Sequence, residues 1–219
     1  MDPDLPFIIE ESRLPSPFPT PQALACHQGV LWLGSRDERR VCGVDPLSWS
    51  VFEQNDALGI PWAAASVGDE IHFTTGEGPE DDRYLRRYRP GVGFDTEYRV
   101  AVPEFTGSYL SHADGSLYLS QWYKHRVLQL DLAGQVLRTV AIGAEISGHT
   151  FARGAFYVLR GTEQDGESWC LARLDLSEAT PRVQDVARVP FACRSLAFDG
   201  RAFWTNHRAQ NETVAFSLP

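Results

Sequence analysis

The chain has 219 residues, of which 43% are hydrophobic and six are tryptophan, and its net charge at pH 7 is −9. Because nucleic acids and anionic membranes bind basic surfaces, this charge argues against partners of both kinds. No apolar run approaches the roughly 20 residues that span a bilayer, and the apolar content suffices for a packed core.

The predicted elements begin with a strand-like segment, Phe7–Glu10, and continue with five repeats. Each repeat contains a glycine followed closely by a short strand of hydrophobic and aromatic residues. The glycines are Gly29, Gly68, Gly115, Gly154 and Gly200. A period of roughly 40–45 residues with strand chemistry is typical of a β-propeller whose blades have four strands. The prediction is an all-β, five-bladed β-propeller of antiparallel blades that forms one domain over residues 1–219.

The first repeat is predicted to contain strands at 23–26, 30–34, 41–45 and 49–53. The last repeat shows only three, at 195–198, 202–205 and Thr213–Ser217. We therefore expect Phe7–Glu10 to pair with Thr213–Ser217 as the outer strand of the last blade. This pairing would close the ring and leave no open edge.

One aromatic position recurs in every repeat, and it is occupied by Trp32, His72, Tyr118, Tyr157 and Trp204. A stacking platform for a ligand is one interpretation of this column. Because the position is the same in all five repeats, we expect it to pack blade against blade instead. Function is expected where the repeats differ.

The repeats differ most in the loops at one mouth of the predicted channel, where binding residues tend to concentrate. These are the loops 35–40, 75–83, 120–126, 160–168 and 206–212, together with the segments that join one blade to the next. The residues predicted there to bind a substrate are Arg36, Trp62, Gln121, Trp122, Arg160, Arg194 and Arg208. Clustered guanidinium groups in an acidic protein suit a carboxylate or a phosphate. The alternative is that these side chains are simply solvated.

Three residues are candidates for acid/base chemistry. His149 and His207 carry imidazoles, which titrate near neutral pH and can transfer protons. Glu77 could orient one of them or help to hold a metal ion. For His149 the alternative is a neutral ring whose hydrogen bonds are satisfied inside the channel wall.

The four cysteines, Cys26, Cys42, Cys170 and Cys193, show no CxxC spacing. They are predicted to be free, buried thiols in a reducing compartment. The segment Met1–Pro6 lacks the basic and apolar regions of a signal peptide. Both observations predict a cytoplasmic protein.

The segments Gly29–Ser35 (GVLWLGS), Asp114–Ser120 (DGSLYLS) and Arg126–Leu132 (RVLQLDL) resemble the NHL, SMP-30 and virginiamycin B lyase-like group of β-propellers. The resemblance covers nearly the whole chain, but its motifs are structural and name no reaction. It implies the propeller fold, in a group that includes lactonases, lyases, glutaminyl cyclases and binding scaffolds. Lyases similar to virginiamycin B lyase use a histidine and a glutamate near a divalent metal ion, a pair that His149 or His207 could form with Glu77. The cofactor is otherwise unknown.

Two functions remain in competition. The first is a small-molecule enzyme at the channel mouth, with lyase- or hydrolase-type chemistry, acid/base or metal-assisted, on a small polar, anionic metabolite. The alternative is a non-catalytic propeller that binds a ligand or a protein. The varied polar loops favour the enzyme. We expect a monomer whose partner is a small molecule.

Overall fold

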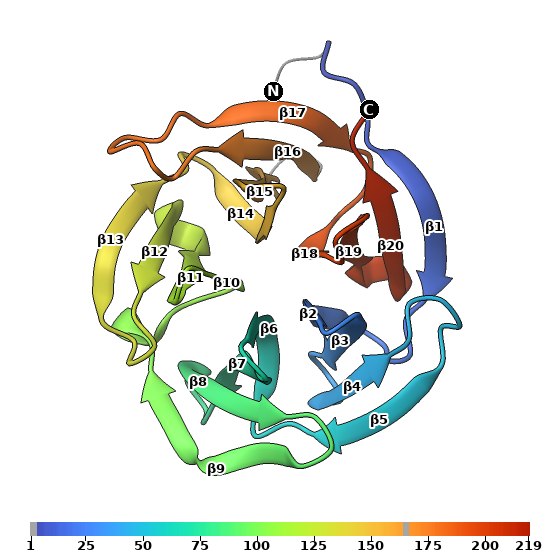
Figure 1. Cartoon of the computed structure of the whole chain (residues 1–219), viewed down its shortest axis with the longest axis vertical. Coiled ribbons are helices and arrows are strands. Elements are labelled where there is room, and N and C mark those ends of the chain that lie inside the picture. Colours follow the sequence, from blue (N-terminus) through green and yellow to red (C-terminus); the bar gives the residue numbers. More distant parts are fainter. Residues whose placement is uncertain (1–3, 164–166) are drawn as a thin grey trace.

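The computed structural model describes residues 4–163 and 167–219. Five four-stranded antiparallel sheets are arranged in a ring around a central channel (Figure 1). The predicted five-bladed propeller is therefore confirmed. Within the described part of the chain, no helix is long and apolar enough to cross a membrane.

In each of the first four blades the strands follow one another outward from the channel. Blade 1 consists of β2 (Pro21–His27), β3 (Val30–Ser35), β4 (Arg40–Val44) and β5 (Val51–Asp56). Blade 2 consists of β6 (Ile60–Val67), β7 (Glu70–Glu77), β8 (Asp82–Arg89) and β9 (Gly93–Ala101). Blade 3 consists of β10 (Leu110–Ala113), β11 (Ser116–Gln121), β12 (Arg126–Leu130) and β13 (Val136–Ala141). Blade 4 consists of β14 (Glu145–Ala152), β15 (Ala155–Thr162), β16 (Ser168–Leu174) and β17 (Gln184–Val189). Blade 5 consists of β18 (Arg194–Phe198), β19 (Phe203–His207), β20 (Glu212–Ser217) and β1 (Ile9–Pro15).

The two ends of the chain close the ring, as expected. Strand β1 pairs antiparallel with β20, with Ile9 opposite Ser217 and Pro15 opposite Glu212. The closing strand lies later in the chain than the predicted segment Phe7–Glu10. The reason is that the residues just before it pair with another blade: the amide of Ile8 donates to the carbonyl of Arg188 in β17, and the amide of Arg188 donates to the carbonyl of Pro6. The N-terminal segment thus joins blade 5 to the outer edge of blade 4.

The hydrophobic core is divided among the five contacts between neighbouring blades. Each contact contains its own cluster of buried residues. Trp32 packs between blades 1 and 2, Tyr118 between blades 3 and 4, and Tyr157 between blades 4 and 5. The recurring aromatic position is therefore part of the core, as predicted.

Bulges interrupt the innermost strands near their first residues. The pairing register shifts between Pro21 and Ala23 in β2 and between Pro61 and Ala63 in β6. A bulge redirects a side chain, and the extra residues are Gln22 and Trp62. In β14, Gly148 follows a similar shift, and a Cβ there would lie 2.5 Å from the carbonyl carbon of Ser195. Glycine is therefore needed where β14 approaches β18.

Candidate ligand site at the channel mouth

The five blades together line a cavity of about 200 Å³ at the channel end where the innermost strands begin. Its walls come from the blade-to-blade segments and from the loops between the second and third strands. The lining residues are Arg36, Trp62, Arg83, Ser108, Tyr109, Trp122, Tyr123, Glu163, Arg194 and Arg208. Four guanidinium groups and four aromatic rings therefore surround one small space.

Five of the seven residues predicted to bind a substrate line this cavity, namely Arg36, Trp62, Trp122, Arg194 and Arg208. Their role in binding stays a prediction. Sequence reasoning missed Arg83, Tyr109, Tyr123 and Glu163. Arg83 and Glu163 lie in loops that had been singled out, and Tyr123 follows Trp122 directly. Tyr109 follows a blade-to-blade segment and occupies the position of Ala23 in β2 and Ala63 in β6. Because those equivalents are small, the repeats gave no signal for a residue that lines the cavity.

Arg208 is held in place by a buried amide. Its Nη1 donates to Oε1 of Gln22 at 2.6 Å, and Nε2 of Gln22 donates to the carbonyl of Trp62 at 3.3 Å. Gln22 itself is fully buried, which the bulge in β2 makes possible. Among the described residues, no carboxylate lies within 4 Å of Arg208. Burial, and next the neighbouring Arg194 charge, hold the pKa of Arg208 below its usual value.

The other three guanidinium groups of the cavity have acidic partners. Arg194 contacts Glu163 and, at 2.6 Å, Glu167. Arg83 lies 2.6 Å from Asp81, and the partly exposed Arg36 lies 3.1 Å from Asp37. Each of these three arginines thus has a carboxylate in direct contact, whereas Arg208 has none among the described residues.

Three of the four aromatic rings of the cavity, those of Trp62, Tyr109 and Trp122, are packed against their neighbours. The Arg83 guanidinium lies 4.3 Å from the ring centre of Trp62, whose Nε1 donates to Asp81 at 3.1 Å. Trp122 packs edge-on against Trp169, with their ring centres 5.4 Å apart. Tyr109 is buried and lies 6.4 Å from Trp122 between ring centres. The cavity therefore offers rigid apolar surfaces beside its charged groups.

His149 does not line this cavity. It is 1% exposed within the channel wall. Its Nε2 lies 3.2 Å from the carbonyl of Tyr109 and must therefore donate, while Nδ1 accepts from Ser111 Oγ at 2.8 Å. Burial lowers the pKa of His149 to about 3, so the ring is neutral. The structure thus places His149 in the satisfied core position that was the alternative interpretation.

The other two candidates for acid/base chemistry also lie outside the lining of the cavity. Both oxygens of Glu77 are engaged, by Arg86 at 2.7 and 3.0 Å and by Arg99 at 3.0 Å. His207 lies at the end of β19, and its Nδ1 accepts from Arg13 of β1 at 3.1 Å. Its ring packs against that of Phe191, with the ring centres 5.1 Å apart. Burial, and next the charge of Arg13, lower the pKa of His207. Neither histidine therefore lies in the cavity that the arginines line, where catalysis by a histidine at the channel mouth would need one.

Two predicted binding residues serve other parts of the structure. Arg160 forms a two-point ion pair with Asp185 at 2.6 and 2.8 Å and lines a separate cavity beside Cys170. Gln121 is buried, accepts from Arg126 at 2.7 Å and donates to the carbonyl of Thr106 at 3.2 Å. It fixes the segment that precedes β10.

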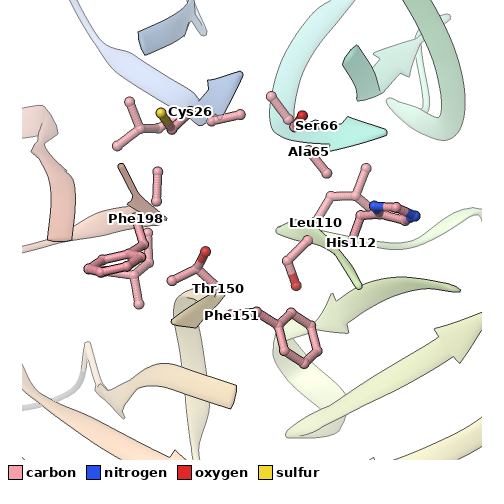
Figure 2. Close-up of a pocket in the computed structure, with 14 residues that line it drawn as sticks. Cys26, Ala65, Ser66, Leu110, His112, Thr150, Phe151 and Phe198 are labelled. Carbon is pink, nitrogen blue, oxygen red and sulfur yellow. The ribbon is translucent and has the colours of Figure 1, made fainter. Parts of the chain in front are cut away.

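The opposite mouth of the channel has a different character. A cavity of about 150 Å³ lies there, near the last residues of the innermost strands. Figure 2 shows Cys26, Ser66, His112 and Thr150 around it, with Phe151 and Phe198 alongside. The described residues that line it include no Asp, Glu, Lys or Arg. The charged groups of the channel are therefore gathered at the first mouth.

The sequence left open a divalent metal ion as cofactor, but the described part of the chain contains no set of residues arranged to bind one. No group of three or more His, Cys, Asp or Glu side chains there is arranged to hold one. The four cysteines are free thiols, and burial raises the pKa of Cys42, Cys170 and Cys193 to about 12.

Comparison with solved structures places the fold among β-propellers. The chain is similar to glutaminyl cyclase of Myxococcus xanthus, with 15% identity, 95% of each chain covered and a TM-score of 0.72. It is also similar to virginiamycin B lyase of Staphylococcus aureus, with 12% identity, 94% of this chain and 69% of that chain covered, and a TM-score of 0.53. A third similar structure is the Pan2 WD40 domain of Neurospora crassa, with 9% identity, 100% of this chain and 97% of that chain covered, and a TM-score of 0.60. The resemblance seen in the sequence thus extends to the fold. No family model and no curated protein matches the chain.

Proposed function

We propose that the protein binds a small anionic molecule at the channel mouth formed by Arg36, Arg194 and Arg208. The observation that carries this proposal is Arg208, a partly buried guanidinium oriented by the fully buried Gln22 without an acidic partner among the described residues. A charge left uncompensated in a partly desolvated cavity is costly, and a bound anion would relieve that cost. The proposal concerns a small ligand, since the cavity measures about 200 Å³.

Replacing Arg208 by glutamine is expected to weaken the binding of small anions by about 10- to 100-fold, the range that corresponds to one charge-assisted hydrogen-bonding group. Titration calorimetry with phenylacetate and with phenyl phosphate measures the effect. Arg201→Gln is the matched control, because Arg201 is exposed on the turn at the opposite end of β18 and pairs with Glu11. Equal affinities in both variants and the unchanged protein would contradict the proposal.

The second candidate is lyase- or hydrolase-type turnover of the bound anion. It is favoured by the presence of a carboxylate, Glu163, and a phenol, Tyr109, in the same cavity as the arginines. Solved enzymes occur among the propellers of similar fold, including the lyase and the cyclase named above. Glu163 would act as the base, since a carboxylate at hydrogen-bonding distance from a substrate can accept a proton.

Glu163→Gln is expected to reduce turnover about 100-fold, the usual loss for a general base. The affinity for anions is not expected to fall, because the change removes a negative charge from the cavity. Nuclear magnetic resonance of small carboxylate-bearing esters and lactones, incubated with each protein, measures turnover. If the unchanged protein binds anions and converts none of these compounds, the non-catalytic binding function is supported instead.

A further inference from the structure

The charges and rings of the channel mouth narrow the class of ligand. We infer that the cavity takes a singly charged carboxylate attached to a flat apolar body, and that it discriminates against doubly charged phosphate groups. This inference rests on the proposed function and specifies its ligand.

The first step is the balance of charge. Arg194 is shared between Glu163 and Glu167, Arg83 is paired with Asp81, and Arg36 is paired with Asp37. Among the described residues Arg208 has no carboxylate in direct contact, so one negative charge on a ligand could pair with it without breaking an ion pair of the protein. A phosphate monoester carries close to two charges at neutral pH. Its second charge would have to draw an arginine away from a carboxylate, and Glu163 in the same cavity would repel it.

The second step is the geometry of Arg208. One of its terminal nitrogens, Nη1, donates to Gln22 at 2.6 Å, so a fully buried side chain anchors one end of the guanidinium group. The remaining N–H groups form part of a planar fork, which can hold two oxygens of a carboxylate or of a phosphate, so the choice between them rests on charge. Substitution by lysine would keep the charge but lose this match.

The third step is the set of aromatic rings beside the charged groups. Trp62, Tyr109, Trp122 and Tyr123 line the same cavity, and Trp62 is held by Arg83 against one face. Tyr123 is 91% exposed at the rim, although large aromatic side chains usually pack against other groups. Trp62 and Trp122 are already held by neighbouring groups, so they can stack on a flat apolar body with little loss of side-chain entropy.

The test compares four compounds by titration calorimetry at one salt concentration: phenylacetate, phenylacetamide, phenyl phosphate and acetate. Phenylacetate is expected to bind at least about tenfold more tightly than each of the others, the effect of one lost charge-assisted contact or one lost stacking surface. Arg208→Lys keeps the charge and loses the planar fork, so it is expected to weaken the binding of phenylacetate about tenfold while the preference over phenyl phosphate remains. Arg201→Gln is expected to change neither.

The outcomes separate the inference from the proposed function. If phenyl phosphate binds as tightly as phenylacetate and both depend on Arg208, the anion site stands and the carboxylate class is wrong. If acetate equals phenylacetate, the flat apolar body is wrong. If no anion binds, or if binding survives Arg208→Gln unchanged, the proposed function itself fails and the inference fails with it.

Discussion

Deletion of residues 1–15 is expected to destabilise the protein by several kcal/mol. The deletion removes β1, whose ladder with β20 contributes about 1 kcal/mol per hydrogen bond, and exposes apolar surface worth about 25 cal/mol per Å². Ile8 and Phe216 belong to the buried cluster between blades 4 and 5, and Leu14 packs against the buried cluster between blades 5 and 1. Because domains are stable by only about 5–15 kcal/mol, much of the total would be lost. Urea unfolding followed by circular dichroism measures the change.

A peptide that spans residues 5–15, added to the truncated protein, provides the control. It is expected to bind the open edge of β20 by strand addition and to restore most of the lost stability. A peptide of the same composition in scrambled order should not. An unchanged unfolding midpoint after truncation would show that β1 contributes little to the closed ring.

Acidification from pH 7 to pH 4.5 is expected to cost the fold about 5 kcal/mol through two buried histidines. Burial lowers the pKa of His149 to about 3 and that of His72 to about 4, from 6.5 for both. Between these values and 6.5 the unfolded chain binds protons that the folded chain does not. The contribution of the two neutral histidines to the free energy of unfolding is therefore fully present above pH 6.5, and it is lost as the pH drops toward 4.

His149→Gln tests this assignment through the slope of stability against pH. The variant removes one titrating group, so the slope between pH 5.5 and pH 4.5 should fall by about 1.4 kcal/mol per pH unit. Glutamine can still offer a donor and an acceptor to Tyr109 and Ser111, the two partners of the imidazole. Urea unfolding at a series of pH values provides the slope. An unchanged slope would show that His149 is not the group that titrates.

The architecture could be predicted because it depends on features that repeat. Glycines in the turns and alternating apolar residues recur in every blade, and the missing fourth strand of the last blade required a partner from elsewhere. The bounds of β1 were harder to predict from the sequence. The predicted segment Phe7–Glu10 is apolar, but the hydrogen bonds of Pro6 and Ile8 to Arg188 tie its first residues to blade 4. The N-terminal segment can pair with the edge of β17 or with the edge of β20. Its own sequence does not show which of its residues pair with which edge.

The site was only partly accessible for a related reason. Loop position identified Arg36, Trp62, Trp122, Arg194 and Arg208, because all lie at one end of the predicted strands. It could not separate Arg208 from Arg160, since their difference lies in a partner far away in sequence: Asp185 neutralises Arg160, whereas a buried amide holds Arg208. His149 was misleading because alternation in a strand does not show which face meets the channel.

Closure of the ring by β1 and β20 constrains the order in which the molecule can be built on the ribosome. Strand β1 is synthesised before blades 1 to 4 and pairs with β20, which is synthesised after them, so β1 stays unpaired with β20 while these blades are made. Contacts between such distant segments slow folding, and an unpaired edge is exposed in the meantime. The short pairing of Pro6 and Ile8 with Arg188 in β17 becomes available one blade earlier. It could dock the waiting strand beside the place where β20 will arrive.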